Sequence, residues 1–296
     1  MRKTIKSFVH SSLCTLILLL VASCATISDD SVPILKENPY TNHKKPLILA
    51  VYHPYPDLRS TFPSPIRPLP GYDGWTDSRM ERDMQRMRGA CINGVLLSIM
   101  PEDLADNIRL ERIRRFYELA AVQQPVFQVA LMLCGNNELT VDNVAQFVYR
   151  KGLADTSSAF RLNGKPILVF DSKVRLVQKG KIENETFCYR QIGKNWPSLP
   201  DGQLFGHPAP PDGFTWVRVA DNHGTVIYDA YDAWVRPRAK GRNFANGMRQ
   251  ALLDKSDIIC IQSWNDFSDG SFIEPNTLDR NLMLTVLQKE LDILSK

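Results

Sequence analysis

Two aspartates near the C-terminus have the spacing and setting for acid–base chemistry. Asp266 and Asp269 lie three residues apart, directly after the apolar run at 257–263, and Gly270 follows with a turn. Cleavage of a glycosidic bond uses such a pair: one carboxyl protonates the leaving oxygen, and the other manages charge or a nucleophile at the anomeric carbon. Most Asp-x-x-Asp spacings instead form an Asx-turn or a helix cap, and this alternative stays open.

The neighbours of the two aspartates fit the same chemistry. Trp264 and Phe267 offer apolar faces on which the C–H side of a sugar ring can lie, and the amide of Asn265 can hydrogen-bond hydroxyls. The segment 264–270 is therefore the leading candidate for a site.

The rest of the chain alternates short apolar runs with longer amphipathic ones, which predicts parallel strands buried by crossover helices. The expected strands are 47–52, 93–99, 126–133, 167–170, 187–192, 214–219, 226–231 and 257–263; the fifth and sixth rest on the weakest patterns. The expected helices are 77–88, 103–122, 140–149, 243–253 and 278–294. This pattern predicts the α/β class and a single-domain (β/α)₈ TIM-type barrel over 47–296, a length usual for one such barrel, which has about 250 residues.

Two of these helices carry explicit apolar stripes. On 77–88 the stripe is Met80, Met84 and Met87, and Gly89 supplies the stop. On 103–122 we expect one stripe of Leu104, Ile108, Ile113, Phe116, Leu119 and Ala120.

Catalytic groups of such barrels sit where strands end, at the C-terminal face. This position selects further substrate-binding candidates: Tyr52, His53, Tyr55, Trp75, Asp171, Asp229, Tyr231, Trp234, Trp264, Asn265 and Glu274. Several have a structural alternative. His53 can be a satisfied structural histidine, Asp171 can cap the next turn, Tyr231 can pack in the core, and Glu274 can bond the backbone amides of its own loop.

The N-terminus resembles the signal peptide of a bacterial lipoprotein. Residues 1–23 combine a basic start with a short apolar stretch, which predicts a signal peptide, and Val21-Ala22-Ser23-Cys24 resembles a bacterial lipobox. We expect Cys24 to be lipidated, residues 24–46 to form a flexible tether, and the protein to be anchored to the cell envelope, with Ala25 favouring the outer membrane. An ordinary cleaved signal peptide is the alternative.

Charge and cysteine spacing argue against a nucleic-acid-binding protein and against a zinc site. The net charge of +4 is mild and no basic cluster alternates with aromatics, so we expect no nucleic-acid partner. Six cysteines become four once Cys14 and Cys24 are set aside, namely Cys91, Cys134, Cys188 and Cys260. An envelope location permits disulfides among them, but Cys91, Cys134 and Cys260 lie in or beside apolar runs, so buried free thiols are the commoner outcome. No CxxC or His/Cys spacing indicates zinc, so neither a metal nor another cofactor is expected.

The segment Ser263–Pro275 resembles the terminal signature of glycoside hydrolase families 71 and 99, read roughly as W-N-[DE]-[WFY]-x-E-G-x-x-[IL]-E-P. Weaker likenesses follow in order at 51–55, 93–97, 163–166 and 228–234. The resemblance implies a retaining, endo-acting α-glycosidase on α-mannan-like or α-1,3-glucan-like polysaccharide. It assigns Asp266 as the base that deprotonates the sugar's own 2-hydroxyl, and Asp269 as the general acid and then base.

One departure from the family pattern matters. The second acidic position is usually glutamate, and Asp269 is shorter by a methylene, which withdraws its oxygens by about 1.5 Å, a shift that can cost roughly a hundredfold in rate. Two rival interpretations therefore remain: a catalytically impaired barrel that binds glycan, and a protein of surface polysaccharide assembly, since similar domains resemble proteins encoded among O-antigen biosynthesis genes.

Overall fold

A parallel sheet forms the centre of the fold. The computed structural model describes residues 45–54, 66–135, 138–162, 164–171, 174–178, 188–191, 214–218, 238–267 and 271–293. The parallel strands are β1 (Leu47–Tyr52), β2 (Gly94–Ile99), β3 (Gln128–Leu133), β6 (Lys165–Phe170), β8 (Cys188–Gln191), β9 (Phe214–Arg218) and β10 (Ile258–Gln262). They pair in the order β9-β10-β1-β2-β3-β6-β8. Because β10 pairs with β1, the last strand of the chain lies beside the first, as in a barrel.

Three short strands lie outside this order. β5 (Arg161–Leu162) pairs antiparallel with the start of β6, and β4 (Glu138–Thr140) pairs with β7 (Arg175–Gln178) in a separate two-stranded sheet. None of the three was expected from the sequence, because runs of two to four residues carry too little periodicity.

The central strands are almost wholly apolar, because both faces of the sheet are covered. β2 reads Gly-Val-Leu-Leu-Ser-Ile and every one of its residues is buried. Gly94 opens this strand against β3 so closely that a Cβ at this position would lie 2.2 Å from the carbonyl oxygen of Gln128. Only glycine therefore fits this position without a shift of the backbone.

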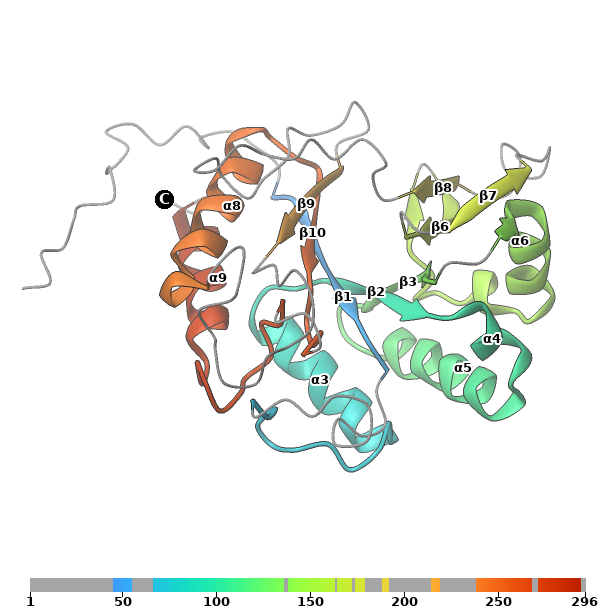
Figure 1. The fold of residues 1–296 in the computed structure, drawn as a ribbon, viewed down its shortest axis with the longest axis horizontal. Coiled ribbons are helices and arrows are strands. Elements are labelled where there is room, and N and C mark those ends of the chain that lie inside the picture. The colour runs from blue at the N-terminus through green and yellow to red at the C-terminus, as the bar shows by residue number, and fades with distance from the viewer. Residues whose placement is uncertain are drawn as a thin grey trace, which may run out of the picture. The chain divides into compact units, whose positions relative to one another are not determined.

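The main helices are α3 (Asp77–Gly89), α4 (Pro101–Ala105), α5 (Asn107–Ala121), α6 (Val141–Arg150), α8 (Arg242–Leu253) and α9 (Leu282–Asp292). In Figure 1, α3 packs against α5, and α8 packs against α9. Thr76 caps α3 through its side chain, and the predicted stripe of Met80, Met84 and Met87 is confirmed, since all three are 0% exposed. Across the described residues, no helix combines the length and hydrophobicity that a membrane crossing needs.

The helix expected over 103–122 is in fact two helices. Asp106 ends α4 and caps α5, accepting hydrogen bonds from the amides of Ile108 (2.8 Å) and Arg109 (3.2 Å). The break resets the helical phase, and Ile108 is 78% exposed instead of lying in the stripe. The placement of Ile108 was therefore wrong. The helix expected over 140–149 is α6, which begins one residue later at Val141, and Thr140 is the last residue of β4.

The ring of strands differs from the expected one at its end. β9, the sixth expected strand, pairs with β10 over five consecutive residue pairs from Phe214↔Ile258 to Arg218↔Gln262. This pairing occupies the edge of β10 opposite β1, so no seventh strand lies between them. The segment expected as that strand, 226–231, lies outside the described residues. The α/β class and the parallel sheet are confirmed, whereas a closed eight-stranded ring is not what the described strands form.

The cysteines only partly follow expectation. Cys91 and Cys260 are free thiols; Cys260 is buried and Cys134 is half-buried, but Cys91 is exposed. Cys91 follows the end of α3 with a φ of 64°, in a turn at the surface, so its apolar sequence neighbours gave the wrong indication. The side chain of Cys188 lies outside the described part of the structure.

Candidate active site

The two faces of the sheet bury different sets of side chains. On the outer face, strand residues such as Tyr52 and Phe170 pack with helix residues such as Met84. On the inner face, Val51 and Val169 belong to a cluster that contains no α-helix residue within the described ranges. The inner face is thus the side of the sheet away from the helices.

Strand alternation brings three titratable groups to this inner face, at the carboxyl ends of the strands. His53 lies two residues after Val51, and Asp171 two residues after Val169, so both continue the inner face beyond β1 and β6. His53 Nε2 lies 3.5 Å from Asp266 Oδ2, and both side chains are 15% exposed. The charge of Asp171 also acts on His53. A histidine and a carboxylate from the exits of β1 and β10 therefore meet where solvent can reach them, and the Asp171 carboxylate at the exit of β6 is near enough for its charge to act on His53.

The histidine in this group is uncharged at neutral pH. Burial lowers the pKa of His53 below its ordinary value, and the negative charges of Asp266 and Asp171 oppose that shift without cancelling it. A neutral imidazole donates one hydrogen bond and accepts another, so His53 can orient a carboxylate or a hydroxyl without adding charge.

Asn265 fixes the backbone that carries His53. The amide of His53 donates to Asn265 Oδ1 (2.7 Å), and Asn265 Nδ2 donates to the His53 carbonyl (2.7 Å) and to the Tyr72 hydroxyl (3.2 Å). Asn265 is 0% exposed. In this placement it contacts protein atoms and holds β1 against the segment after β10.

Beneath Asn265 lies a buried polar network of Tyr52, Tyr72, Arg79, Asp83 and Glu274. The Tyr72 hydroxyl donates to Glu274 Oε2 (2.5 Å), and the Arg79 guanidinium lies 3.3 Å above the centre of the Tyr72 ring. Arg79 Nε and the Tyr52 hydroxyl both donate to Asp83 Oδ2, at 3.4 and 2.9 Å. Tyr52 and Glu274 are 0% exposed, so both contact this network and not solvent.

Burial decides the ionisation of the network. It raises the pKa of Glu274 to about 8, with the charge of Asp83 acting in the same direction and the Tyr72 hydrogen bond and Arg79 opposing it. Burial also raises the pKa of Asp83, against the opposing charge of Arg79. Glu274 is therefore protonated at neutral pH, which lets a carboxyl group sit in the interior at lower cost.

The aromatic residues Trp264 and Phe267 of the segment 264–270 are buried in the protein. Trp264 is 0% exposed and lies in the outer-face core. Phe267 is 2% exposed and stacks on Phe272, with ring centres 4.3 Å apart and planes at 14°. Arg238 lies over the Phe272 ring at 4.2 Å. The rings of Trp264 and Phe267, which we predicted to contact a sugar, therefore pack against other protein residues.

The loop after β10 folds back on itself. The amides of Ile273 and Glu274 both donate to the carbonyl of Trp264, at 3.0 and 2.8 Å, and the amide of Asp266 donates to Ser263 Oγ (2.7 Å). The peptide bond between Gln262 and Ser263 is cis. The hydrogen bonds of this loop position Asp266 at the strand exit.

Six predicted residues lie outside the described residues: Cys24, Tyr55, Asp229, Tyr231, Trp234 and Asp269. Of the remaining candidates, His53 and Asp266 are in contact, Asp171 acts on His53 through its charge, and Trp75 is partly buried beside a neighbouring cavity. Tyr52, Trp264, Asn265 and Glu274 lie in the buried support beneath them.

Tyr72, Arg79 and Asp83 are not among the candidates that the sequence pattern selects. A signal for two of them exists, since Arg79 and Asp83 are four residues apart on α3, beside the methionine stripe, where charged residues need a buried partner. Tyr72 lies in a loop, and nothing in its local pattern reveals its contact with Glu274, which is 202 residues away in the chain.

Comparison with solved structures decides what kind of fold carries this site. A GH99 endo-α-mannosidase from Bacteroides thetaiotaomicron, in complex with bis-tris-propane, superimposes with a TM-score of 0.63 at 13% identity, covering 84% of this chain and 97% of that one. The chain has a GH99-like fold. A second structure of the GH99 endo-α-mannosidase from this organism gives a TM-score of 0.58 at 12% identity, with the same coverages. A glycoside hydrolase-like protein gives 0.56 at 12% identity, covering 84% of this chain and 94% of that one.

No protein-family model matches this sequence, and no curated protein sequence matches it either. The GH99-like likeness thus rests on three-dimensional structure and concerns the fold. Within that GH99-like fold, His53, Asp171 and Asp266 occupy the carboxyl edge of the strands.

Proposed function

We propose that this chain is a glycoside hydrolase that cleaves α-linked glycans, with Asp266 and Asp269 as its catalytic carboxyl groups. The observation that carries the proposal is the position of Asp266: it leaves β10 at the carboxyl edge, is 15% exposed, and lies 3.5 Å from His53. In barrels this edge is where catalytic residues gather. The GH99-like fold is consistent with the same chemistry.

The proposed reaction takes place in two balanced steps. First, Asp266 takes the proton of the sugar's 2-hydroxyl, this oxygen attacks the anomeric carbon, the glycosidic bond breaks, and Asp269 gives its proton to the leaving oxygen. Then Asp269 takes a proton from water, the water oxygen attacks the anomeric carbon, the bond between the anomeric carbon and the 2-oxygen breaks, and the 2-oxygen regains its proton from Asp266. The configuration is retained because the anomeric carbon is inverted twice. Neutral His53 orients the Asp266 carboxylate, and the buried polar network keeps His53 in place.

The shorter side chain of Asp269 supports one competing function. If its carboxyl group stays about 1.5 Å short of the leaving oxygen, turnover falls by roughly a hundredfold and a glycan-binding role remains. Replacement Asp269→Glu distinguishes the two, because restoring the reach should raise the rate of an enzyme and leave a binding protein inactive.

Three further features belong to the proposal. The seven parallel strands from β9 to β8 form part of a (β/α)₈ barrel, which the pairing of β10 with β1 supports. The chain is lipidated at Cys24 and acts in the cell envelope, with the outer membrane as the preferred location. Its substrate is an α-mannan-like or α-glucan-like polysaccharide cut within the chain.

The test is a screen of the purified mature protein on α-mannans and α-glucans, with reducing-end release and glycan binding measured in parallel. Asp266→Asn and Asp269→Asn should each abolish release while leaving binding within severalfold of the parent. Asp257→Asn is the matched control, because Asp257 precedes the same strand β10 at its opposite, amino-terminal end and is exposed. Binding without release in the parent would replace the hydrolase with the glycan-binding protein. Absence of both would overturn the proposal.

A further inference from the structure

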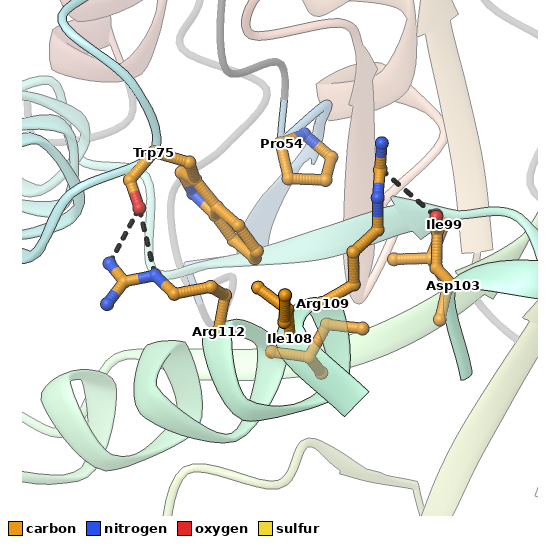
Figure 2. A pocket seen from close by; sticks show the side chains of 8 residues that line it. Pro54, Trp75, Ile99, Asp103, Ile108, Arg109 and Arg112 are labelled. Atoms are coloured by element: carbon orange, nitrogen blue, oxygen red, sulfur yellow. Dashed lines mark hydrogen bonds and ion pairs between the residues drawn. The ribbon is translucent and has the colours of Figure 1, made fainter. Parts of the chain in front are cut away.

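A cavity of about 220 Å³ lies beside the candidate active site. Figure 2 shows it between Pro54, Trp75, Ile99, Asp103, Ile108 and Arg109. A water molecule fills about 30 Å³ in the liquid, so this volume corresponds to about seven waters, which suits one small ring and is below the range of drug-sized pockets.

The cavity shares the carboxyl edge of the sheet with the candidate active site. Pro54 directly follows His53, and Ile99 is the last residue of β2, the strand that pairs with β1. The other lining residues come from the start of α5, from α4, and from the loop before α3. An extended glycan bound across His53 and Asp266 would therefore pass this cavity.

Trp75 is held rigidly at the cavity wall. One packing partner of its indole is the core residue Phe116, with ring centres 5.8 Å apart and planes at 30°. Arg112 donates from Nε (3.0 Å) and from its second terminal nitrogen (2.6 Å) to the Trp75 carbonyl, as the dashed lines in Figure 2 show. Arg112 is fixed in turn by Asp77, at 2.8 Å. A preformed aromatic wall of this kind costs little ordering when a ligand binds.

The rest of the lining combines aliphatic surface with one charged pair. Ile108 is 78% exposed, and Ile99 and Pro54 extend the same apolar surface. Arg109 and Asp103 form an ion pair at 3.0 Å, with side chains 52% and 13% exposed. The cavity thus offers apolar faces together with a donor and an acceptor at its rim.

We propose that this cavity is a subsite for one sugar ring of the glycan, separate from the ring that is cleaved. The C–H face of a pyranose packs on Trp75 and Ile108, and its hydroxyls pair with Asp103 and Arg109. The charged pair favours a sugar over a purely aliphatic ligand, which would leave both groups without a ligand partner. This inference rests on the proposed function, since it takes the ligand to be the same glycan.

The test measures glycan affinity in an Asp266→Asn background, which removes turnover, by titration calorimetry with an α-linked mannotetraose and an α-linked glucotetraose. Ile108→Asn should weaken binding of the preferred tetrasaccharide about tenfold, the effect of losing a well-packed apolar contact. Val122→Asn is the matched control, because Val122 is a similarly exposed aliphatic residue (69%) at the other end of α5. The Val122→Asn protein should bind the tetrasaccharide with an affinity within twofold of the background protein.

A second variant, at Trp75, is tested for both binding and folding. Trp75→Ala should also weaken binding about tenfold, and because Trp75 packs on the core its unfolding midpoint is measured alongside. Equal affinities of the Ile108→Asn and Val122→Asn proteins would overturn the subsite, as would displacement of the tetrasaccharide by hexanol. If the parent hydrolyses glycan while these affinities are equal, the subsite fails and the proposed function stands. If no tetrasaccharide binds, the subsite is overturned, and hydrolysis by the parent decides the function independently.

Discussion

Replacement of Asn265 by alanine tests whether the buried support holds His53. The substitution removes three hydrogen bonds, two to the backbone of His53 and one to the Tyr72 hydroxyl. Each buried polar group that loses its partner costs about 1–3 kcal/mol. Some of this loss is recovered if a water molecule enters the space left by the amide. We therefore expect the free energy of unfolding to fall by about 3–5 kcal/mol.

The assay is urea unfolding at neutral pH, followed by tryptophan fluorescence and by circular dichroism to check that both probes give one transition. Asn281→Ala is the control, because Asn281 is exposed and its side chain makes no capping hydrogen bond to α9. That variant should stay within about 0.5 kcal/mol of the parent.

The same substitution should also reduce activity. The His53 backbone loses two anchors, and a displacement of about 1 Å in a catalytic group can cost roughly a hundredfold in rate. A change of less than about 1 kcal/mol in the unfolding free energy of the Asn265→Ala protein would refute the role assigned to this amide.

Three other results are expected. Glu274 holds its proton more tightly in the folded protein, with a pKa of about 8 against an ordinary 4.5, so the free energy of unfolding falls as pH rises between these values. In urea titrations, Glu274→Gln should remove roughly 2–4 kcal/mol of the decrease that the parent shows between pH 5 and pH 8. An unchanged dependence of the free energy of unfolding on pH would contradict this. Asp266→Asn should lower the pKa of His53 further, because it removes a charge that favours imidazolium; NMR titration of the imidazole checks this, and a raised pKa would count against the contact. Gly94→Ala should destabilise the fold by about 1–3 kcal/mol or more, because its methyl group would meet the carbonyl of Gln128; chemical unfolding measures it, and a neutral result would show that β2 can move.

Most of the helices and strands could be predicted because their apolar periodicity is long and regular. The strand 47–52 and the helix starting at Asp77 agree with the structure at these residues, since a wholly apolar run and a methionine stripe leave few alternatives. The break at Asp106 was missed because the side chain of one aspartate, by capping its own backbone, overrides the helical pattern on both sides. The direct pairing of β9 with β10 is a long-range contact that local patterns do not contain.

The candidate site was predictable in position but not in the direction of its side chains. The rule that catalytic groups follow strand ends selected His53 and Asp266, which are in contact, and Asp171, whose charge acts on His53. It also selected Tyr52, one residue before His53, which faces the helices because side chains alternate along a strand.

Trp264 was selected as a sugar platform because tryptophan serves both as a ligand surface and as core. Its burial depends on how the loop folds back to Ile273 and Glu274, which a local sequence pattern does not encode.

Catalysis by the Asp266 carboxylate is tested by the initial rate of glycan hydrolysis of the Asp266→Asn protein, compared with the parent and with the Asp257→Asn protein on the preferred α-glycan. Loss of a catalytic acid–base group should lower the rate by about 10²–10⁴-fold, with the Asp257→Asn protein unchanged. A rate for Asp266→Asn within about threefold of the parent would lie far outside that range and would contradict the assignment of this carboxylate to catalysis.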